Sequence, residues 1–570
     1  MDDTTTPLIC LPCVYQPNDV SCICTQTNVL NLQVDAILLE QDRLKISRSS
    51  TTHPLVRNPT AAGATAGAPP PPAPPGEAIM NALKARAVCR KIAQDHPNKP
   101  ITAVAEAAWQ GQPDLLQGDS LTALSPHITE RYGPVISCLT FANSNVIETS
   151  EGLVMIDCGT AQNAPRIYNM IRKLTDKPLH TVIYTHGHVD HIAVNHMDFQ
   201  EPFTVVAQEN CVARFDRYKK TNGYNTIINA RQFQIGSTMG KSSAQVSFEA
   251  SHGTGYSFMH EFRYPDRTYQ EYLRFNVGEE TFELFAGKGE TDDATIIWMP
   301  ERRFCFCGDF FIWNAPNAGN PQKVQRYPEE WISAARKILS LRPIIVFPGH
   351  GPPIIGEGRV REAFQNQALL LEGICSYAMN GINTGRSLQE IMSTVPIPPE
   401  LVSKPYLRPN YDDPRWFVAT LWRRYAGWYV VFVFFFTFFG KAEMRRFELI
   451  FFILFSSFFF FFFVFSPRYT FDVRHLLPVS AGDVGKELAK LVGGADKLAE
   501  FAAKIMNEGG PRKLGIALEI AEMAAKAEEG AKRGHEIRAQ ILRAMEKRET
   551  TLMARSIYRA AAIDSEKSKL

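Results

Sequence analysis

The chain has almost no excess of charge of either sign: 61 lysines and arginines stand against 59 aspartates and glutamates in 570 residues, a net charge of +2. Domains that bind nucleic acids usually carry a clear basic excess, so we expect no nucleic-acid partner. The start, Met1–Thr6, lacks the basic and apolar regions of a secretory signal. This absence predicts a cytoplasmic protein whose 11 cysteines are thiols rather than disulfides.

Long apolar runs are also missing, with one exception between residues 430 and 471, which hold 18 of the 37 phenylalanines. Within this stretch, Leu449–Phe465 is at the short limit of the ~17–25 residues that span a membrane, and poly-phenylalanine is a poor composition for such a helix. We interpret residues 430–474 as an insertion, either a translated intron or a membrane segment. Membrane contact, and a membrane-associated location, are expected only if the segment is genuine.

The N-terminal residues 1–78 contain little that could form a core, and an alanine- and glycine-rich stretch there runs into a proline cluster. Such a composition predicts a disordered, low-complexity leader. Four of its cysteines have a C-x-x-C and C-x-C spacing that could bind a structural zinc: Cys10, Cys13, Cys22 and Cys24. The loop between the two pairs is short, so we interpret them as part of the leader.

The densest polar motif follows a short apolar run, Thr181–Tyr184, which predicts a buried β-strand. Directly after it the chain reads H-x-H-x-D-H, three imidazoles and a carboxylate within six residues. Imidazole nitrogen and carboxylate oxygen are ligands of zinc-like ions. The spacing lets His186 and His188 serve one ion, while Asp190 and His191 reach a second ion nearby, as in two-metal hydrolytic sites.

This motif resembles the signature of the metallo-β-lactamase superfamily, an α/β fold built as an αββα sandwich with a dinuclear site at one edge of its sheets. Other segments resemble the superfamily's opening strands and later metal motifs: Phe141–Ile147, Gly152–Thr160, Gly289–Asp293, Cys307–Asp309 and Phe347–Gly351. Most members have a histidine where this chain has Glu290. A glutamate there is similar to the alkyl sulfatase branch, which Pro316–Gln322, Arg408–Asp412 and Trp422–Tyr429 also resemble.

The resemblance implies a site for two Zn2+ ions per chain. Seven residues make up the predicted ligand set: His186, His188 and Glu290 for the first ion, Asp190, His191 and His350 for the second, and Asp309 as the bridge. Metal-bound water, whose pKa falls from 15.7 towards ~7, would be the nucleophile. Residues predicted to act in catalysis or sulfate binding are Asp190, Tyr224, Arg231 and Asn317, with Asn229 beside them. For Tyr224 and Arg231 a structural role, in capping helices or pairing with surface acids, is the alternative.

The expected activity is hydrolysis of a small-molecule sulfate ester. The alternatives are a hydrolase of the same fold that acts on another ester, thioester or lactam, and an inactive dimeric scaffold. The expected parts of the chain, in order, are the leader 1–78, a helical lead-in 79–125, a catalytic domain 126–355, a helical dimerisation domain 356–429 and 475–558 around the insertion 430–474, and a tail 559–570. The dimerisation resemblance implies a homodimer.

Overall fold

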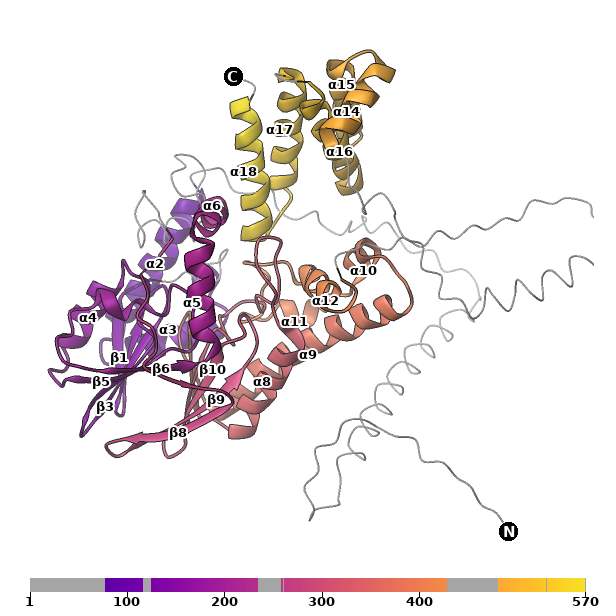
Figure 1. Cartoon of the computed structure of the whole chain (residues 1–570). Helices are drawn as coiled ribbons and strands as arrows, with labels where there is room; N and C mark the ends of the chain where they lie inside the picture. Colours follow the sequence, from indigo (N-terminus) through magenta and orange to yellow (C-terminus); the bar gives the residue numbers. More distant parts are fainter. Residues whose placement is uncertain are drawn as a thin grey trace, which may run out of the picture. The chain divides into compact units, whose positions relative to one another are not determined.

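The computed structural model describes residues 77–115, 125–233, 258–259, 261–427, 480–528 and 531–568 (Figure 1). The leader except for its last two residues, its four cysteines, and the whole insertion 430–474 lie outside these described residues. The predictions made for them stay predictions.

The first sheet has seven strands in chain order: β1 Ile128–Tyr132, β2 Val135–Leu139, β3 Ser144–Thr149, β4 Gly152–Ile156, β5 Leu179–Ile183, β6 Thr204–Gln208 and β7 Arg267–Tyr269. Strands β1 to β4 pair antiparallel, and β4 to β7 pair parallel. The predicted strand at Thr181–Tyr184 is therefore β5, with Tyr184 just beyond its end. Its carboxyl end delivers the H-x-H-x-D-H motif to one edge of the sheet.

The second sheet has six strands in the order β13-β12-β11-β10-β9-β8. Their bounds are β8 Tyr272–Val277, β9 Glu280–Gly287, β10 Ala294–Met299, β11 Phe304–Gly308, β12 Ile345–Pro348 and β13 Ile354–Ile355. Only β11 and β12 pair parallel, and they are joined through a helix. Because β9 and β10 are antiparallel, the end of β9 lies at the same edge as the ends of β11 and β12.

Successive side chains of a strand point to opposite faces of its sheet, and in these strands both faces are apolar. The inner faces of the two sheets pack against each other, and the outer faces pack against helices. In β11, Phe304 and Phe306 join the core between the sheets, while Cys305 and Cys307 face the helices outside. In β2, Val135 points inward and Ile136 outward in the same way. The two thiols are buried and free, and because they are two residues apart on a strand they lie on the same face of the sheet.

Helices cover the outer face of each sheet. The first sheet packs against α4 Ala164–Arg172 and α5 Asn210–Lys220. The second packs against α3 Pro100–Trp109, α8 Pro328–Leu341, α9 Glu357–Asn383 and α12 Phe417–Tyr425 (Figure 1). This is the predicted αββα sandwich. The lead-in forms α2 Glu77–Asp95, α3 and a 3-10 turn, η1 Pro113–Leu115, so its first helix begins within the last residues assigned to the leader.

The helical region contains α10 Leu388–Thr394, α11 Pro399–Val402, η3 Pro414–Trp416, α14 Ala481–Val492, α15 Ala495–Glu508, α16 Pro511–Ala527, α17 Lys532–Glu546 and α18 Leu552–Ser568. Gly509 and Gly510 separate α15 from α16, which begins at Pro511. Small side chains such as Ala499, Ala517 and Ala521 let α15, α16 and α17 pack closely. Helix α18 continues through the residues expected to form a tail, because Ala562 and Ser565 are buried.

The C-terminal helices contact the rest of the fold at a short backbone pairing. The amide of Leu552 donates to the carbonyl of Asn410 at 2.9 Å, and that of Met553 donates to Tyr411 at 3.2 Å. Helix α18 also packs on α6 Asn222–Phe233. The start of α18 is thus fixed to the segment that follows α11.

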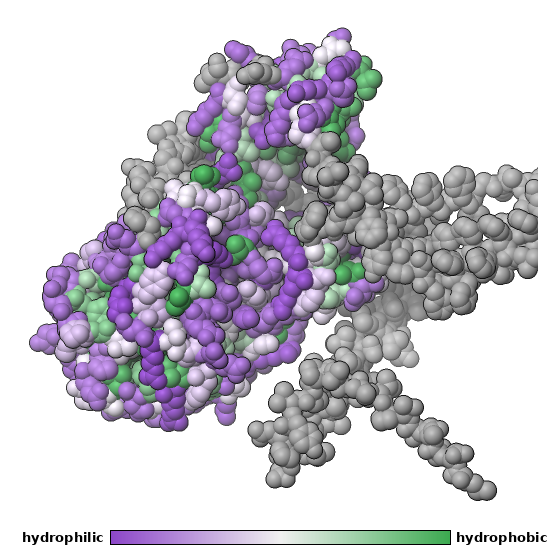
Figure 2. Space-filling model, in the orientation of Figure 1, coloured by the Kyte–Doolittle hydropathy of each residue, from purple (hydrophilic) through white to green (hydrophobic). Residues whose placement is uncertain are grey.

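The surface of the described residues carries few large apolar side chains. On the face in Figure 2, hydrophilic residues cover most of this surface, and apolar residues occur in small groups among them. Within the described ranges, no helix is both long and apolar enough to cross a membrane. That finding does not extend to the phenylalanine-rich insertion, and the cytoplasmic location expected from the sequence stays a prediction.

Candidate metal centre

The seven predicted metal ligands meet at one edge of the sandwich, although they come from both sheets. The loop after β5 supplies the first four of them. The loop between β9 and β10 supplies Glu290, the end of β11 supplies Asp309, and the end of β12 supplies His350. All three strand ends lie at the same edge because of the pairing described above. The sandwich therefore assembles the cluster from residues up to 164 positions apart, His186 to His350.

The first group is centred on His186 and His188. Nε2 of His186 lies 3.0 Å from Nδ1 of His188, and the latter lies 3.9 Å from Oε1 of Glu290. Gly187 allows the two rings to approach, because a side chain there would collide with Arg214 and Asp293, each 2.8 Å from the position of a Cβ. The H-x-H spacing thus turns both imidazoles and Glu290 towards one point.

The second group contains Asp190, His191 and His350. Oδ2 of Asp190 lies 3.4 Å from Nε2 of His350 and 3.8 Å from Nε2 of His191. Asp309 lies between the groups: its Oδ1 is 3.5 Å from Nε2 of His191, and its Oδ2 is 3.8 Å from Nε2 of His186. Gly349 makes room for this carboxylate, since a Cβ there would lie 2.1 Å from Oδ1 of Asp309. Oδ2 also lies 3.6 Å from Nε2 of His350, so Asp309 faces histidines of both groups, and its Oδ2 alone reaches one in each.

The donor set fits metal ions. Three sets of three residues together contain all seven predicted ligands and share His191 and Asp309, and the ligand atoms within each set lie within 4.8 Å of one another. Ligand atoms on a tetrahedral zinc with bonds of ~2.1 Å are about 3.4 Å apart. Nε2 of His191 and Oδ1 of Asp309 are buried without a hydrogen-bond partner. Two unpaired polar atoms that face each other in a buried site are costly unless an ion or water binds them.

Outer hydrogen bonds fix the orientation of the histidines. Nδ1 of His191 lies 2.8 Å from Oδ2 of Asp157, and the Asp157 carboxylate also accepts from the amide and hydroxyl of Thr185, at 2.8 and 2.7 Å. Nδ1 of His350 lies 2.6 Å from the carbonyl oxygen of Phe141, so it is the protonated nitrogen. Both rings are left with Nε2 free for an ion, which is the usual arrangement for metal-bound histidine.

Asp157→Asn should weaken metal binding roughly 10- to 100-fold, because loss of the carboxylate behind a metal-bound histidine lowers its basicity and frees its orientation. Competition with a fluorescent zinc chelator measures this change. Glu151→Gln, an exposed acid in the turn between β3 and β4, is the matched control and should bind metal like the parent. Equal affinity in Asp157→Asn and the control would show that Asp157 does not act on the site.

A buried ion pair between Arg214 and Asp293 supports the backbone of the H-x-H turn. Arg214 on α5 places its Nε 3.0 Å from Oδ1 of Asp293 and also pairs with Asp292. Oδ2 of Asp293 accepts from the amide of Gly187 at 2.8 Å. Arg214 and Asp293 are almost completely buried. They hold the backbone between His186 and His188 in place, and the sequence reading assigned a role to neither.

The histidines of the cluster differ in pKa, because burial and neighbouring charges act on them to different extents. Burial lowers the pKa of His186 to about 4, with a further contribution from His191. Burial also acts to lower the pKa of His191, but the carboxylates of Asp309, Asp190 and Asp157 outweigh it and raise the pKa to about 9. The same balance holds the pKa of His350 well above its usual value. Without an ion, protonated His191 and His350 balance the negative charge of the neighbouring carboxylates.

Zinc binding at pH 7 should release about two protons, because His191 and His350 must lose theirs before they can bind an ion. The free protein holds more protons than the loaded one, so zinc affinity should fall as pH falls below about 9. Calorimetric titration in two buffers of different ionisation enthalpy counts the protons. Binding that releases none at pH 7 would contradict the protonation of this pair.

The residues predicted to act on the substrate have different positions. Nδ2 of Asn317 donates to Oε1 of Glu290 at 2.7 Å, so Asn317 contacts a predicted ligand directly. Tyr224 and Arg231 lie on α6 with exposed side chains, 61% for Tyr224. Neither has a hydrogen bond or ion pair with the metal cluster among the described residues. Asn229 is buried, and its amide donates to the carbonyl of Asn225 within the same helix at 2.8 Å.

Two cations near the cluster were missed in the sequence. Arg326 is 2% exposed; its Nη1 donates to the Glu290 carbonyl at 2.6 Å and forms an ion pair with Oε1 of Glu290 at 2.7 Å. Lys323 lies in the same loop, close enough for its charge to act on His188 and Asp190. Burial lowers the pKa of Lys323 to about 8. Both lie in the polar part of the segment between β11 and α8, and this position was the sequence signal that could have pointed to them.

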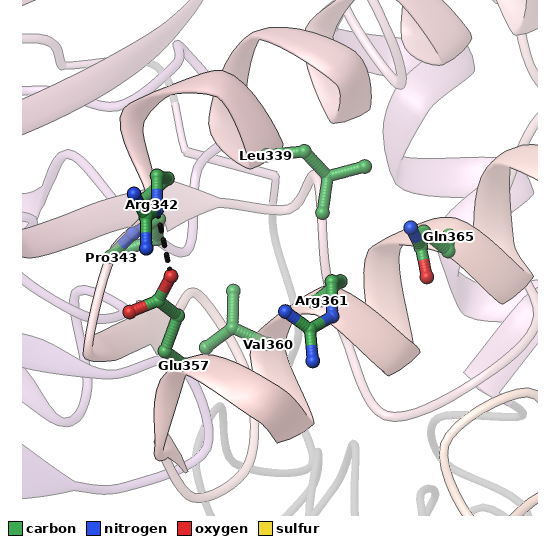
Figure 3. A pocket seen from close by; sticks show the side chains of 7 residues that line it. All are labelled: Leu339, Arg342, Pro343, Glu357, Val360, Arg361 and Gln365. Atoms are coloured by element: carbon green, nitrogen blue, oxygen red, sulfur yellow. Dashed lines mark hydrogen bonds and ion pairs between the residues drawn. The ribbon is translucent and has the colours of Figure 1, made fainter.

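A separate cavity lies between α8 and α9. Its volume is about 310 Å³, and its lining includes Leu339, Val360 and Gln365 (Figure 3). The guanidinium of Arg342 pairs with Glu357 at 2.8 Å on one side of it. No residue predicted for metal or substrate lines it. The predicted chemistry therefore belongs to the edge of the sandwich and not to this cavity.

Comparison with known families agrees with both halves of this architecture. Residues 139–205 match the metallo-beta-lactamase superfamily, and residues 387–431 and 469–568 match the alkyl sulfatase dimerisation family. The chain carries a metallo-beta-lactamase domain and an alkyl sulfatase dimerisation domain. This confirms the resemblance seen in the sequence. The gap in the match to the dimerisation domain coincides with the phenylalanine-rich segment, whose status as an insertion stays a prediction.

Individual relatives are alkyl sulfatases. The chain is 23% identical over 313 residues to a linear primary-alkylsulfatase of Pseudomonas sp.. This match covers 50% of the chain and 56% of the relative. It is 24% identical over 361 residues to the alkyl/aryl-sulfatase BDS1 of Saccharomyces cerevisiae, over 58% of this chain and 53% of the relative. The chain thus spans about half the length of the curated relatives it matches.

The metallo-beta-lactamase fold is also seen in a solved relative. The structure of the stereoselective inverting sec-alkylsulfatase Pisa1 from Pseudomonas sp. has a TM-score of 0.62 at 17% identity. The similarity covers 86% of this chain and 78% of Pisa1. At this identity the comparison establishes the fold, an αββα sandwich followed by helices, in agreement with the predicted fold class.

Proposed function

We propose that this chain hydrolyses sulfate esters of small organic molecules with water activated by two Zn2+ ions. The observation that carries the proposal is the convergence of seven predicted ligands from two sheets around unpaired buried atoms. Relatives named as alkyl sulfatases support the choice of a sulfate ester over other substrates. The proposal covers metal identity, metal number and substrate.

We assign the ligands to the two ions as the resemblance implies. His186, His188 and Glu290 would hold the first ion, and Asp190, His191 and His350 the second. Asp309, whose carboxylate lies within 4 Å of His186, His191 and His350, would serve both. When bound, the ions supply a water of lowered pKa and positive charge opposite the ester.

Asp190 and His188 are the ligands most open to a substrate, with 23% and 19% of their side chains exposed. His191 and Asp309, at 0% and 9%, lie deeper. Burial acts to raise the pKa of Asp190, but His191 and His350 outweigh it and hold the pKa well below its usual value. Asp190 is therefore a carboxylate at neutral pH, and we assign it to accept a hydrogen bond from the attacking water.

The sulfate group needs a cation that is not already paired. Arg326 is engaged by Glu290, whereas Lys323 has no ion pair among the described residues. We assign Lys323 to bind a sulfate oxygen, since a partly buried ammonium beside the cluster would attract an anion strongly. Asn317 is assigned to hold Glu290. Tyr224 and Arg231, exposed on α6, are left for the part of the substrate farthest from the metals.

The helical domain is proposed to form a homodimer, because it matches the dimerisation family over two long segments. Its described surface has exposed apolar side chains on neighbouring helices, among them Leu491 at 82% and Phe501 at 51%. Light scattering at micromolar concentration tests this directly. A monomeric mass there would contradict it.

The function is tested with undialysed, purified protein. Elemental analysis should give close to two zinc ions per chain. A panel of alkyl sulfates, a lactone, a thioester, a phosphodiester and a chromogenic cephalosporin should show hydrolysis of the sulfates alone, lost with chelator and restored by zinc. Preferred hydrolysis of another substrate would replace the sulfatase assignment, and a metal-free protein with no activity would identify a scaffold.

A further inference from the structure

Thr185 comes directly before the H-x-H-x-D-H motif, and its buried hydroxyl lies between groups that belong to both proposed metal sites. Its Oγ1 is 2.7 Å from Oδ2 of Asp157 and 3.1 Å from Nδ1 of His186. The same Oδ2 of Asp157 lies 2.8 Å from Nδ1 of His191. A continuous chain of hydrogen bonds therefore runs from His186, a proposed ligand of the first ion, to His191, a proposed ligand of the second.

This chain of hydrogen bonds has a defined direction. A carboxylate oxygen only accepts, so the hydroxyl of Thr185 donates its hydrogen to Asp157 and its oxygen is left to accept. Nδ1 of His186 must then carry the ring hydrogen and donate it to Thr185. Nε2 of His186, which lies 3.8 Å from Oδ2 of Asp309, is left without a hydrogen and can bind an ion. Thr185 thus selects the tautomer of His186 that metal binding requires.

The carboxylate at the centre of this chain is rigidly held. Asp157 has a left-handed backbone, with a φ of 57°. That conformation is uncommon for a residue with a side chain and persists only where the surroundings impose it. Here the amide of Asp157 donates to the carbonyl of Ile183 at 3.1 Å, and its carbonyl accepts from the hydroxyl of Ser144 at 2.7 Å. Strands β3 and β5 therefore fix the position from which Asp157 meets Thr185 and His191.

The hydroxyl of Thr185 is enclosed by the second sheet. The carbonyl of Thr185 accepts from the amide of Thr295 in β10 at 2.7 Å. Gly308 in β11 lies so close that a Cβ at this position would be 2.5 Å from Oγ1 of Thr185. The side chain of Thr185 is only 2% exposed. Valine has the same shape and fits this space, but it can neither donate to Asp157 nor accept from His186.

We infer that Thr185 is a positioning residue that links the two metal sites, because it extends the hold of the Asp157 carboxylate from His191 to His186. Asp157 contacts His191 directly and reaches His186 only through the Thr185 hydroxyl. Loss of the hydroxyl should therefore weaken the first ion alone, whereas loss of the carboxylate should weaken both. The inference rests on the metal site of the proposed function but not on its substrate.

The test is zinc affinity of the full chain, measured by chelator competition for one ion at a time. His350→Ala removes a ligand of the second ion and leaves the first site, whereas His188→Ala does the reverse. In the His350→Ala background, Thr185→Val should weaken zinc binding roughly tenfold. In the His188→Ala background, Thr185→Val should change it less than about twofold, while Asp157→Asn should weaken it roughly tenfold. Equal effects of Thr185→Val in the two backgrounds would overturn the inference.

Two variants separate the hydroxyl from its surroundings. Thr185→Ser keeps the donor and the acceptor, so its zinc affinity should stay within about threefold of the parent. Thr181→Val is the matched control: Thr181 is a buried threonine on the same strand, and its hydroxyl lies 2.8 Å from Nδ1 of His180, which is outside the ligand set. It should bind both ions like the parent. A loss in either variant as large as that in Thr185→Val would assign the effect to packing and contradict the link.

The tautomer of His186 gives a second reading, which does not depend on the folding of Thr185→Val. In the zinc-free parent with nitrogen-15-labelled histidine, magnetic resonance should place the ring hydrogen of His186 on Nδ1. Its signals are assigned by their loss in His186→Asn. A hydrogen on Nε2 would overturn the inference. Normal zinc binding without sulfatase activity in the parent would remove the proposed substrate and leave the link between the two sites intact.

Discussion

Asp309→Asn and His188→Ala should each reduce hydrolysis by roughly a thousandfold or more while the protein stays folded. The Asp309 carboxylate faces histidines of both halves of the cluster, so an amide in its place offers a single neutral oxygen and removes the negative charge between the two proposed ions. His188 is one of the two imidazoles that define the first site. Turnover of an alkyl sulfate and zinc content by elemental analysis measure the effect.

Folding of these variants should be close to normal, because the core between the sheets consists of other residues. Thermal unfolding of the zinc-free forms provides the comparison with the zinc-free parent. His196→Ala is the matched histidine control, since His196 is exposed at the end of η2 Ala193–His196 and should retain full activity. Activity within a few-fold of the parent in Asp309→Asn would remove Asp309 from the site.

Arg214→Ala should destabilise the protein by about 3–5 kcal/mol, because it leaves the buried carboxylate of Asp293 without its partner. Asp293 is 1% exposed and holds the amide of Gly187, so the damage reaches the H-x-H turn directly. We therefore expect a lower unfolding midpoint in denaturant together with loss of the first zinc. Urea unfolding followed by circular dichroism gives the free energy.

Lys220→Ala provides the comparison, since it removes an exposed cation from the same helix, α5. Its unfolding free energy should stay within about 0.5 kcal/mol of the parent. A double variant, Arg214→Ala with Asp293→Ala, removes both charges and should recover part of the loss. An Arg214→Ala protein as stable as the control would mean that Asp293 finds compensation elsewhere.

The parts of the site that the sequence predicted well are those fixed by local geometry. The H-x-H-x-D-H turn follows directly after a strand, so its side chains must emerge together at one sheet edge. Glu290, Asp309 and His350 were found through the family motifs around them, each of which ends or follows a strand. Helix ends such as that at residues 509–511 are equally local, because two glycines and a proline cannot continue a helix.

The parts that were missed depend on pairing between distant segments. Asp157 reaches His191 because β4 and β5 pair in parallel, with Met155 beside Val182. Arg214 and Asp293 are 79 positions apart. No periodicity in one segment indicates the register of another. The family motif placed Arg231 and Tyr224 with the site, but both are exposed on α6. Apolar and polar residues are mixed along this helix, so its sequence did not indicate which face is exposed.

The origin of the ligands in two sheets has a consequence for the order in which the molecule is assembled. One sheet contributes the histidines after β5, and the other contributes Glu290, Asp309 and His350. A nascent chain that has completed only the first sheet holds half of each coordination set and can retain ions only weakly. High-affinity capture must therefore wait for translation to pass His350 and for the sheets to dock. Ions held by the proposed ligand set would link the two layers, so we expect their removal to weaken the contact between the sheets.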